Sequence, residues 1–255
     1  MKGGQTLGVL GGITVALTLT LAVSVLSVAA QSAGQALPTA DMLACAPRLA
    51  ALEASAGRLV GASDNLRKRL FRQGDTVLIN VGASSEVAVG TQFFTRRRVT
   101  ITTPALWDRL LQADVTTGWL RAVEVHETAT LAVIERTCAD VHQDDLLAPF
   151  QWPAPVTAMA SGAVSHDDPA MVLFGADGRA LSAAGQMFVI DQGTDQGLAL
   201  GQRVTVFRPG ATPDAPVTEL GDGVAVFTEA ASATIHLRRA REPVKAGDSL
   251  AIQRP

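Results

Sequence analysis

The chain has 255 residues, of which 47% are hydrophobic and 18% are charged, and its formal net charge is −3. This length is sufficient for one large domain or two small ones. The slightly negative charge gives no long-range attraction to nucleic acid, and we expect no nucleic-acid partner. Tyrosine is absent and aromatic residues make up only 4% of the chain, which argues against an aromatic-lined sugar groove.

Residues 1–36 read as a signal peptide or N-terminal anchor. Lys2 precedes an uncharged stretch, 6–31, that is rich in leucine, valine, alanine, glycine and threonine, and small residues follow it. The apolar run also reaches the ~20 residues needed to span a bilayer. Membrane contact is therefore expected only through this segment, if it is not cleaved. Both interpretations predict an exported protein of the periplasm or cell envelope, or a secreted one.

The chain has two cysteines, Cys45 and Cys138. In an oxidising compartment they predict one disulfide, which would close a loop of roughly 90 residues and stabilise the fold by about 4 kcal/mol. Alternatively, residues 42–45 form a lipoprotein cleavage box, although Pro38 and Asp41 separate them from the apolar run. Two distant cysteines and four histidines are too few ligands for a metal site, and we expect no metal and no cofactor.

Residues 37–57 are predicted to form an N-terminal helical segment. The periodic pattern extends over 43–59, where Leu49, Leu52 and Leu59 recur among alanines while Glu53 and Arg58 face outward.

The remaining sequence consists of two similar halves. Three sequence features of the first half recur 111 positions later, as Gly82 does at Gly193. Three others recur 103 positions later, as Gly118 does at Gly221. The first set is Asn80-Val81-Gly82, Gly90 and Arg97, matched by Asp191-Gln192-Gly193, Gly201 and Arg208. The second set is Gly118, Asp145 and Leu147, matched by Gly221, Asp248 and Leu250. We predict related units at 58–149 and 169–255, joined by a proline-rich linker at 150–168.

Each unit is predicted to be a small closed barrel, so the fold class is mainly β. β-Branched residues alternate in short segments, as in 77–81, and this period of two indicates strands. Gly82 and Gly193 are expected where a turn requires positive φ. The segments after them, 87–90 and 198–201, are expected to place two apolar side chains each in the core. Gly90 and Gly201 then permit a sharp corner.

The glycine pattern resembles that of a known domain. The pattern consists of Asp191, Gly193, Gly197 and Gly201, a strand that ends at Arg208, and then Gly221, Gly223 and Gly247-Asp248. It is similar to the pattern of the C-terminal domain of flagellar assembly protein T. The resemblance extends to related SH3-like barrels of exported bacterial proteins. It covers 170–253 well and 58–148 more loosely, because Glu86 replaces Gly197 and Asp144 replaces Gly247. It implies a tandem SH3-like fold, a cell-envelope setting and no catalytic residues.

The sequence contains no convincing reactive constellation. Ser165-His166-Asp167-Asp168 has the letters of a hydrolase triad, but adjacent residues cannot converge as triad members do. The pairs Asp144-Asp145 and Asp167-Asp168 lack the ligand spacing of a calcium loop. His126, His142 and His236 are predicted at the surface. We therefore expect no enzyme activity and name no catalytic residue.

Two basic patches and one insertion are the candidate contact sites. Arg96-Arg97-Arg98 with Arg121, and Arg238-Arg239 with Arg241, could attract an anionic partner or protect an edge strand from aggregation. The insertion within 98–117 could form one or two helical turns, and either contacts a partner or plugs a barrel end. The candidate partner-contact residues are Leu106, Trp107, Leu110, Arg96 and Arg98.

These observations lead to two hypotheses. The first is a non-enzymatic, exported cell-envelope protein that acts as a structural or protein–protein interaction module, with another envelope protein as partner. The alternative is a peptidoglycan or envelope-polysaccharide binding protein.

Overall fold

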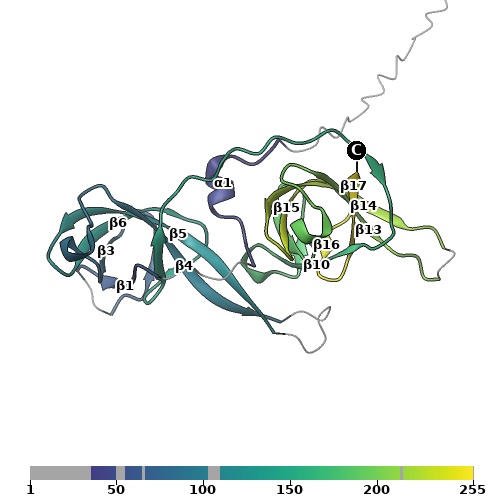
Figure 1. Cartoon of the computed structure of the whole chain (residues 1–255). Coiled ribbons are helices and arrows are strands. Elements are labelled where there is room, and N and C mark those ends of the chain that lie inside the picture. The colour runs from purple at the N-terminus through teal and green to yellow at the C-terminus, as the bar shows by residue number, and fades with distance from the viewer. Residues whose placement is uncertain (1–35, 50–54, 65–66, 103–109, 213–214, 255) are drawn as a thin grey trace, which may run out of the picture. The chain divides into compact units, whose positions relative to one another are not determined.

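The computed structural model describes residues 36–49, 55–64, 67–102, 110–212 and 215–254. Over these residues the protein is mainly β, with two closed six-stranded barrels and one α-helix near the N-terminus (Figure 1). The predicted export segment lies almost wholly outside the described residues. No helix among those described is both long and apolar enough to cross a bilayer.

The first barrel has the strand order β1-β3-β6-β5-β4-β8 and is closed by antiparallel pairing of β1 with β8. Its strands are β1 (Gly57–Ala62), β3 (Thr76–Ile79), β4 (Gln92–Ile101), β5 (Leu111–Val125), β6 (Thr130–Thr137) and β8 (Leu146–Pro149). A short pair flanks the ring, β2 (Leu70–Phe71) with β7 (Val141–His142), and η1 (Ala83–Ser85) is a 3-10 turn. The core side chains are buried aliphatic residues together with Phe71 and Phe93, as expected for a barrel too narrow for a channel.

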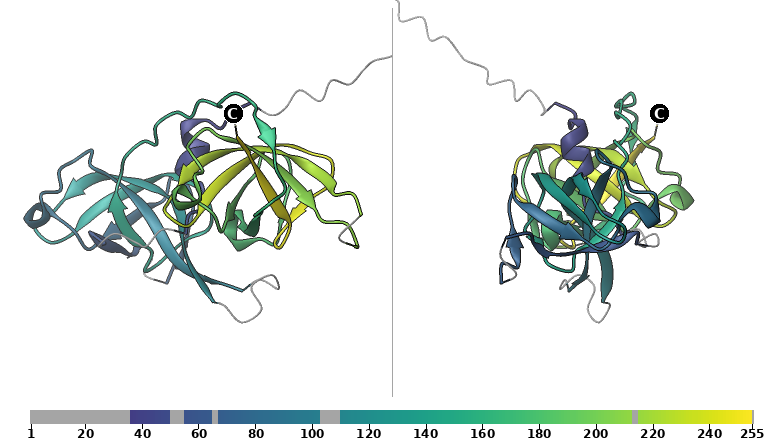
Figure 2. Two further views of the ribbon diagram at one scale, coloured as in Figure 1. Left: turned by 45° about the vertical axis from the view of Figure 1, so that its right-hand side comes forward. Right: turned by 90° about the vertical axis from the view of Figure 1, so that its left-hand side faces the viewer.

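The second barrel repeats this topology, with the order β10-β12-β15-β14-β13-β17 and closure by β10 with β17. Figure 2 shows the ribbon from two further sides. Its strands are β10 (Ala170–Gly175), β12 (Met187–Ile190), β13 (Arg203–Arg208), β14 (Thr218–Thr228), β15 (Ala233–Ala240) and β17 (Ser249–Arg254). The flanking pair is β11 (Leu181–Ser182) with β16 (Val244–Lys245), and the 3-10 turns are η3 (Ala176–Gly178) and η4 (Thr194–Gln196).

The two barrels agree in register as well as in strand order. Leu59 faces Ile79 before a bulge in the first barrel, and Val172 faces Ile190 before a bulge in the second. In each barrel, a backbone N–H of the first strand also donates a 2.6 Å hydrogen bond to a side-chain oxygen, from Arg58 to Asn80 Oδ1 in β1 and from Met171 to Asp191 Oδ1 in β10. A shared bulge and a shared side-chain bond are details that two unrelated barrels would not be expected to repeat.

Gly82 and Gly193 occupy corresponding corners, but positive φ is not the reason for them. Their φ angles are −150° and −144°, which any residue adopts, so the sequence-based prediction is wrong on this point. Glycine is needed because neighbouring backbone lies against its Cα. A Cβ on Gly82 would lie 2.7 Å from the nitrogen of Ala129, and one on Gly193 would lie 2.7 Å from the oxygen of Ser232. Gly90 and Gly201, in contrast, have φ of +92° and +82°.

The apolar segments between these glycines each bury one side chain rather than two. Val87 and Leu198 are buried, whereas Val89 is 69% exposed and Leu200 is 49% exposed. The tight turn after each buried residue leaves room for only the first side chain to reach the core. The prediction of two core residues in each segment is therefore wrong.

An arginine–aspartate pair with a buried carboxylate recurs at the same place in each barrel. Nε and Nη2 of Arg97 donate to both carboxylate oxygens of Asp145 at 2.7 and 2.9 Å. Arg208 does the same to Asp248 at 2.9 and 3.0 Å. Each carboxylate also accepts a 2.9 Å bond from the backbone three residues earlier. The bidentate bond to Asp248 raises the pKa of Arg208 despite partial burial.

The N-terminal helix is much shorter than the sequence pattern suggested. α1 (Ala40–Ala44) is one turn, capped by Thr39, and the described residues between it and β1 are not helical. Pro47 cannot donate a helical hydrogen bond and disfavours helix at Ala46. Leu59 belongs to β1 instead. The predicted helix over 43–59 is therefore wrong in extent, although residues 50–54 lie outside the described part.

The insertion of the first half lengthens a hairpin. β4 and β5 stay paired from the Gln92/Arg121 pair to the Ile101/Leu111 pair. β4 is therefore longer than its counterpart in the second barrel, β13, which has six residues. The far part of this hairpin shares a buried cluster with the second barrel, in which Ile101 and Ala113 join Phe174 and Val189. Residues 103–109 lie outside the described part, so the predicted helical turns are not seen where the chain is described.

The linker between the barrels is extended, as its prolines suggested. Its one strand, β9 (Ala163–Val164), pairs with the end of β17. Near its start, Phe150 and Trp152 pack with aromatic residues of the first barrel.

Candidate functional site

A cavity of about 510 Å³ opens beside the first barrel, and we call it the aromatic groove. Its walls come from the N-terminal segment around α1, from β4 and β5, from the first residues of the linker and from β14. Its aromatic lining residues are Phe94, Phe150, Trp152 and Phe227, and its polar ones are Arg48, Arg96, Asp114, Thr116 and Gln151. This volume lies within the range of small-ligand sites.

The apolar wall is a packed aromatic cluster of Phe94, Trp119, Phe150 and Trp152. The ring centroids of Phe94 and Phe150 are 4.6 Å apart, and Trp152 stands edge-on to both Phe150 at 5.0 Å and Trp119 at 5.5 Å. These are favourable distances and orientations for aromatic pairs. Trp119 is 5% exposed and anchors the cluster, whereas Trp152 is 47% exposed and offers a rigid apolar surface to solvent.

Two guanidinium groups lie on aromatic faces at the groove. The Arg48 guanidinium is 4.8 Å from the ring centroid of Phe227, and that of Arg96 is 5.3 Å from Phe94. Both distances are within cation–π range. Arg48 also forms an ion pair with Glu229, while its Nε is buried with no hydrogen-bond partner in the described part of the chain. Stacking on these rings restricts the positions of both positive groups.

One carboxylate, that of Asp114, is nearly buried at the groove wall. Its residue is 8% exposed, and Arg98 Nε lies 3.4 Å from Oδ1. Burial raises the pKa of Asp114, although the hydrogen bond from Arg98 and the charges of Arg98 and Arg96 oppose that rise. The backbone N–H of Asp114 donates to the oxygen of Arg48, which attaches the N-terminal segment to β5.

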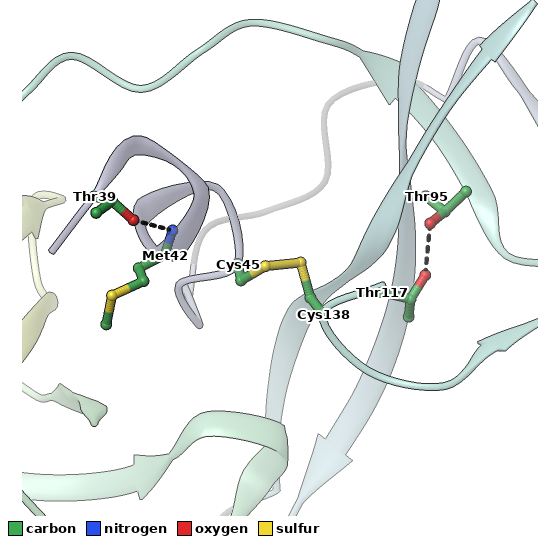
Figure 3. The surroundings of a disulfide bond; sticks show 6 residues. All are labelled: Thr39, Met42, Cys45, Thr95, Thr117 and Cys138. Carbon is green, nitrogen blue, oxygen red and sulfur yellow. Dashed lines mark hydrogen bonds between the residues drawn. A yellow bond between two sulfur atoms is a disulfide. The ribbon is translucent and has the colours of Figure 1, made fainter. Parts of the chain in front are cut away.

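The predicted disulfide is present and supports one wall of the groove. Cys45, which follows α1, is bonded to Cys138, which follows β6, with 5.3 Å between their Cα atoms (Figure 3). Both cysteines pack against the buried cluster that contains Phe94 and Trp119. Nearby on β4 and β5, a 2.8 Å hydrogen bond joins the hydroxyls of Thr95 and Thr117. A disulfide is typical of proteins in an oxidising compartment.

Of the predicted partner-contact residues, the structure describes Arg96, Arg98 and Leu110. Arg96 lines the groove, and Arg98 supports it through Asp114. Leu110 is 67% exposed just before β5. Leu106 and Trp107 lie outside the described residues, so their predicted role stays a prediction.

The basic patches are largely matched by acidic side chains. Arg121 pairs with Glu135 at 2.5 Å and Arg241 with Glu219 at 3.7 Å, while Arg239 pairs with Asp222. β8 pairs with β4 only as far as Arg96. At Arg97 and Arg98, β4 therefore pairs with β5 on one side and with no other described strand.

The reactive-looking residues have local partners. Ser165 Oγ donates to Asp167 at 2.8 Å in an exposed turn, while His166 stands edge-on to Phe207. His126 and His142 are exposed as predicted, but His236 is 1% exposed on β15, so its predicted surface position is wrong. Within the described ranges, no three histidine, cysteine, aspartate or glutamate residues gather as a metal site would require.

Sequence reasoning missed most of the aromatic groove. Phe150 and Trp152 fall within the predicted proline-rich linker at 150–168, and the sequence pattern assigns no binding role to Phe94 or Phe227. Two bulky aromatics within a proline-rich connection are unusual for a solvated linker, and that was the available signal. A low overall aromatic content said nothing about whether those residues cluster.

A scan against models of known protein families found no match to this chain, and a search of curated proteins found no similar sequence. The resemblance to the domain of flagellar assembly protein T therefore stays a prediction.

Proposed function

We propose that this protein is a non-enzymatic, exported protein of the cell envelope that acts as an interaction module for another envelope protein. The observation that carries the proposal is the aromatic groove, where exposed Trp152 and stacked Arg48 and Arg96 lie together. Tryptophan and arginine are enriched among residues that dominate binding energy at protein interfaces. The disulfide supports an oxidising compartment, and the composition of residues 6–31 supports export.

Crosslinked pull-down from an envelope extract tests this function. The full chain serves as bait beside two variants, Trp152→Ala and the matched control Leu181→Ala, which removes an apolar side chain 57% exposed on β11. We expect wild type and Leu181→Ala to retain the same partner. Failure of every bait to recover a specific partner would contradict the proposal.

One observation favours a second candidate, a peptidoglycan or envelope-polysaccharide binding protein. Aromatic rings suited to stacking on sugar rings are concentrated in the groove despite their low abundance in the chain. Cosedimentation with purified cell-wall sacculi separates the two candidates, because an interaction module for proteins stays in the supernatant.

A further inference from the structure

A segment near the N-terminus, residues 37–47, covers the outer face of the second barrel, and we call it the N-terminal strap. Its Leu43 and Ala46 share a buried cluster with Met187 of β12 and Val224 of β14. The side chains that fill the interior of this barrel form a separate cluster. The strap therefore packs on the outside of the strands, together with part of the linker.

His236 of β15 lies beneath this cover. It pairs with Met187 on one side and with Val224 on the other, and directly paired residues of neighbouring strands project from the same face. His236 is 1% exposed. On the same face, two positions earlier, Thr234 Oγ1 donates a buried 2.6 Å hydrogen bond to the backbone oxygen of Pro47 in the strap. The imidazole is therefore shielded from water where the strap is attached.

The surroundings of the ring favour its neutral form. Nδ1 of His236 is buried, and none of the described residues provides it with a hydrogen-bond partner. A neutral imidazole leaves one nitrogen without a proton, whereas the protonated ring carries an N–H on both. Protonation beneath the strap would therefore bury a charge and an N–H without an acceptor, which is unfavourable.

The charged groups around His236 do not offset this penalty. β12 and linker residues 150–165 carry no titratable side chain, and the strap carries one carboxylate, that of Asp41. The two carboxylates of β14 already pair with arginines, Glu219 with Arg241 and Asp222 with Arg239. Burial lowers the pKa of His236, the charge of Arg238 lowers it further, and a backbone hydrogen bond with Gly185 partly opposes them.

We propose that protonation of His236 releases the N-terminal strap from the second barrel. Water then reaches Nδ1, and Met187 and Val224 lose their cover. The disulfide keeps Cys45 of the strap bonded to Cys138, so the released strap stays attached to the first barrel. The strap also forms part of the wall of the aromatic groove, so its release opens that wall. Acidification thereby changes the candidate site, a form of control that goes beyond the proposed interaction function.

Hydrogen–deuterium exchange of the purified full chain, followed by mass spectrometry, tests the proposal. The backbone N–H groups of Leu43 and Cys45 donate within the α1 turn, and a helix of five residues is not stable without packing. Protection of these amides therefore reports docking of the strap.

The expected change follows from the protonation of one group. After correction for the intrinsic effect of pH on exchange, the opening constant of the strap should rise about tenfold from pH 7.5 to pH 5.5. The released imidazole regains a pKa of about 6.5, while the docked one stays neutral over this interval. Strap amides should also exchange faster than those of β15 at pH 5.5, because release precedes global unfolding.

Two histidine variants assign the effect. His236→Val removes the titrating group and introduces the residue that the first barrel carries at the corresponding position, Val133 of β6. We expect its opening constant to be the same at both pH values. The matched control His142→Gln removes an exposed histidine of β7 and should keep the tenfold change. Melting curves verify the folding of each variant.

Thr234→Val tests the attachment itself. It removes the hydrogen bond to Pro47 and should raise the opening constant about fivefold at both pH values, with the same ratio between them. The wild-type and Thr234→Val measurements decide the question even where His236→Val is too unstable to measure.

Three results would each overturn the proposal. The first is an opening constant of wild type that does not change with pH. The second is a pH effect that persists in His236→Val, which would assign it to another group, such as Asp114, whose pKa burial raises. The third is strap exchange no faster than that of β15 at pH 5.5, which would show global unfolding instead of release.

Discussion

Asp145 and Asp248 perform the same structural task in the two barrels. Each carboxylate is 2% exposed, accepts two bonds from one arginine and a third from the backbone of its own turn. A charged group buried this deeply is stable only when its oxygens are fully occupied. The arginine–aspartate pair therefore fixes the turn before the closing strand in each unit.

We expect Asp248→Asn to lower the free energy of unfolding by roughly 2–3 kcal/mol, because it leaves Arg208 without its bidentate partner. Urea unfolding measures the change. The control is Glu242→Gln, whose carboxylate is 56% exposed and lies 3.2 Å from the same arginine. That exposed pair should contribute less than about 1 kcal/mol. Equal losses in the two variants would show that burial of Asp248 is unimportant.

Glu86 holds a backbone conformation that its counterpart Gly197 adopts more easily. Their φ angles are +62° and +81°, so the two units share the left-handed corner although the residue differs. We expect Glu86→Gly to stabilise the protein by about 1 kcal/mol, because glycine has no Cβ to strain there. Glu86→Ala keeps the Cβ and should give no gain. Thermal unfolding of both variants distinguishes this from an effect of the lost charge.

His236 makes stability depend on pH. Burial lowers its pKa below the usual 6.5, the charge of Arg238 adds to the effect, and a backbone hydrogen bond with Gly185 partly opposes it. The contribution is complete above pH 6.5 and is lost as pH falls through the lowered pKa of the folded state. We expect unfolding free energy to fall from pH 7.5 toward 5.5, and less so in His236→Val. Identical slopes in both proteins would refute this.

At the level of elements, the disulfide joins the segment after α1 to the end of β6. It spans 93 positions of sequence and restricts the unfolded chain strongly. We expect the Cys45→Ser, Cys138→Ser double variant to lose about 4 kcal/mol of unfolding free energy. Dithiothreitol should reproduce the loss in wild type and have no effect on the variant. A reductant effect on the variant would assign the loss to something other than this bond.

The β4–β5 hairpin shows how one element has acquired a second role. Within the first barrel, β4 and β5 form part of the wall. Beyond Arg96, β4 pairs with β5 alone, and the two strands continue to the buried cluster that they share with the second barrel. The corresponding strands β13 and β14 stop earlier, because residues such as Pro209 and Pro216 occupy the connection there.

For the whole molecule, the described residues from 36 onward form one compact unit. One buried cluster includes residues of both barrels, and another joins the N-terminal segment and the linker to the second barrel. A buried hydrogen bond from Thr234 Oγ1 to the backbone oxygen of Pro47 also connects the N-terminal segment to the second barrel. We therefore expect a single cooperative transition in calorimetry, with equal calorimetric and van't Hoff enthalpies. Two resolved transitions would show that the barrels unfold independently. Val189→Ala, in the shared cluster, should lower the stability of the whole protein.

Sequence alone determined the repeated architecture of this protein. Alternation in segments such as 77–81, glycines at corners such as Gly90 and Gly201, and two cysteines are local or countable signals, and barrels and disulfide followed from them. Local patterns succeed here because strand alternation and positive φ depend on a residue and its near neighbours.

Tertiary structure alone decided the rest. Position 82 requires glycine because backbone around Ala129, more than forty positions away in sequence, packs against it. The burial of His236 depends on β12 and β14, the strands on either side of β15. The aromatic groove combines residues from position 43 to position 227. Packing between segments so distant leaves no periodic trace in sequence, because each side chain is positioned by elements that are neighbours only after the barrels have closed.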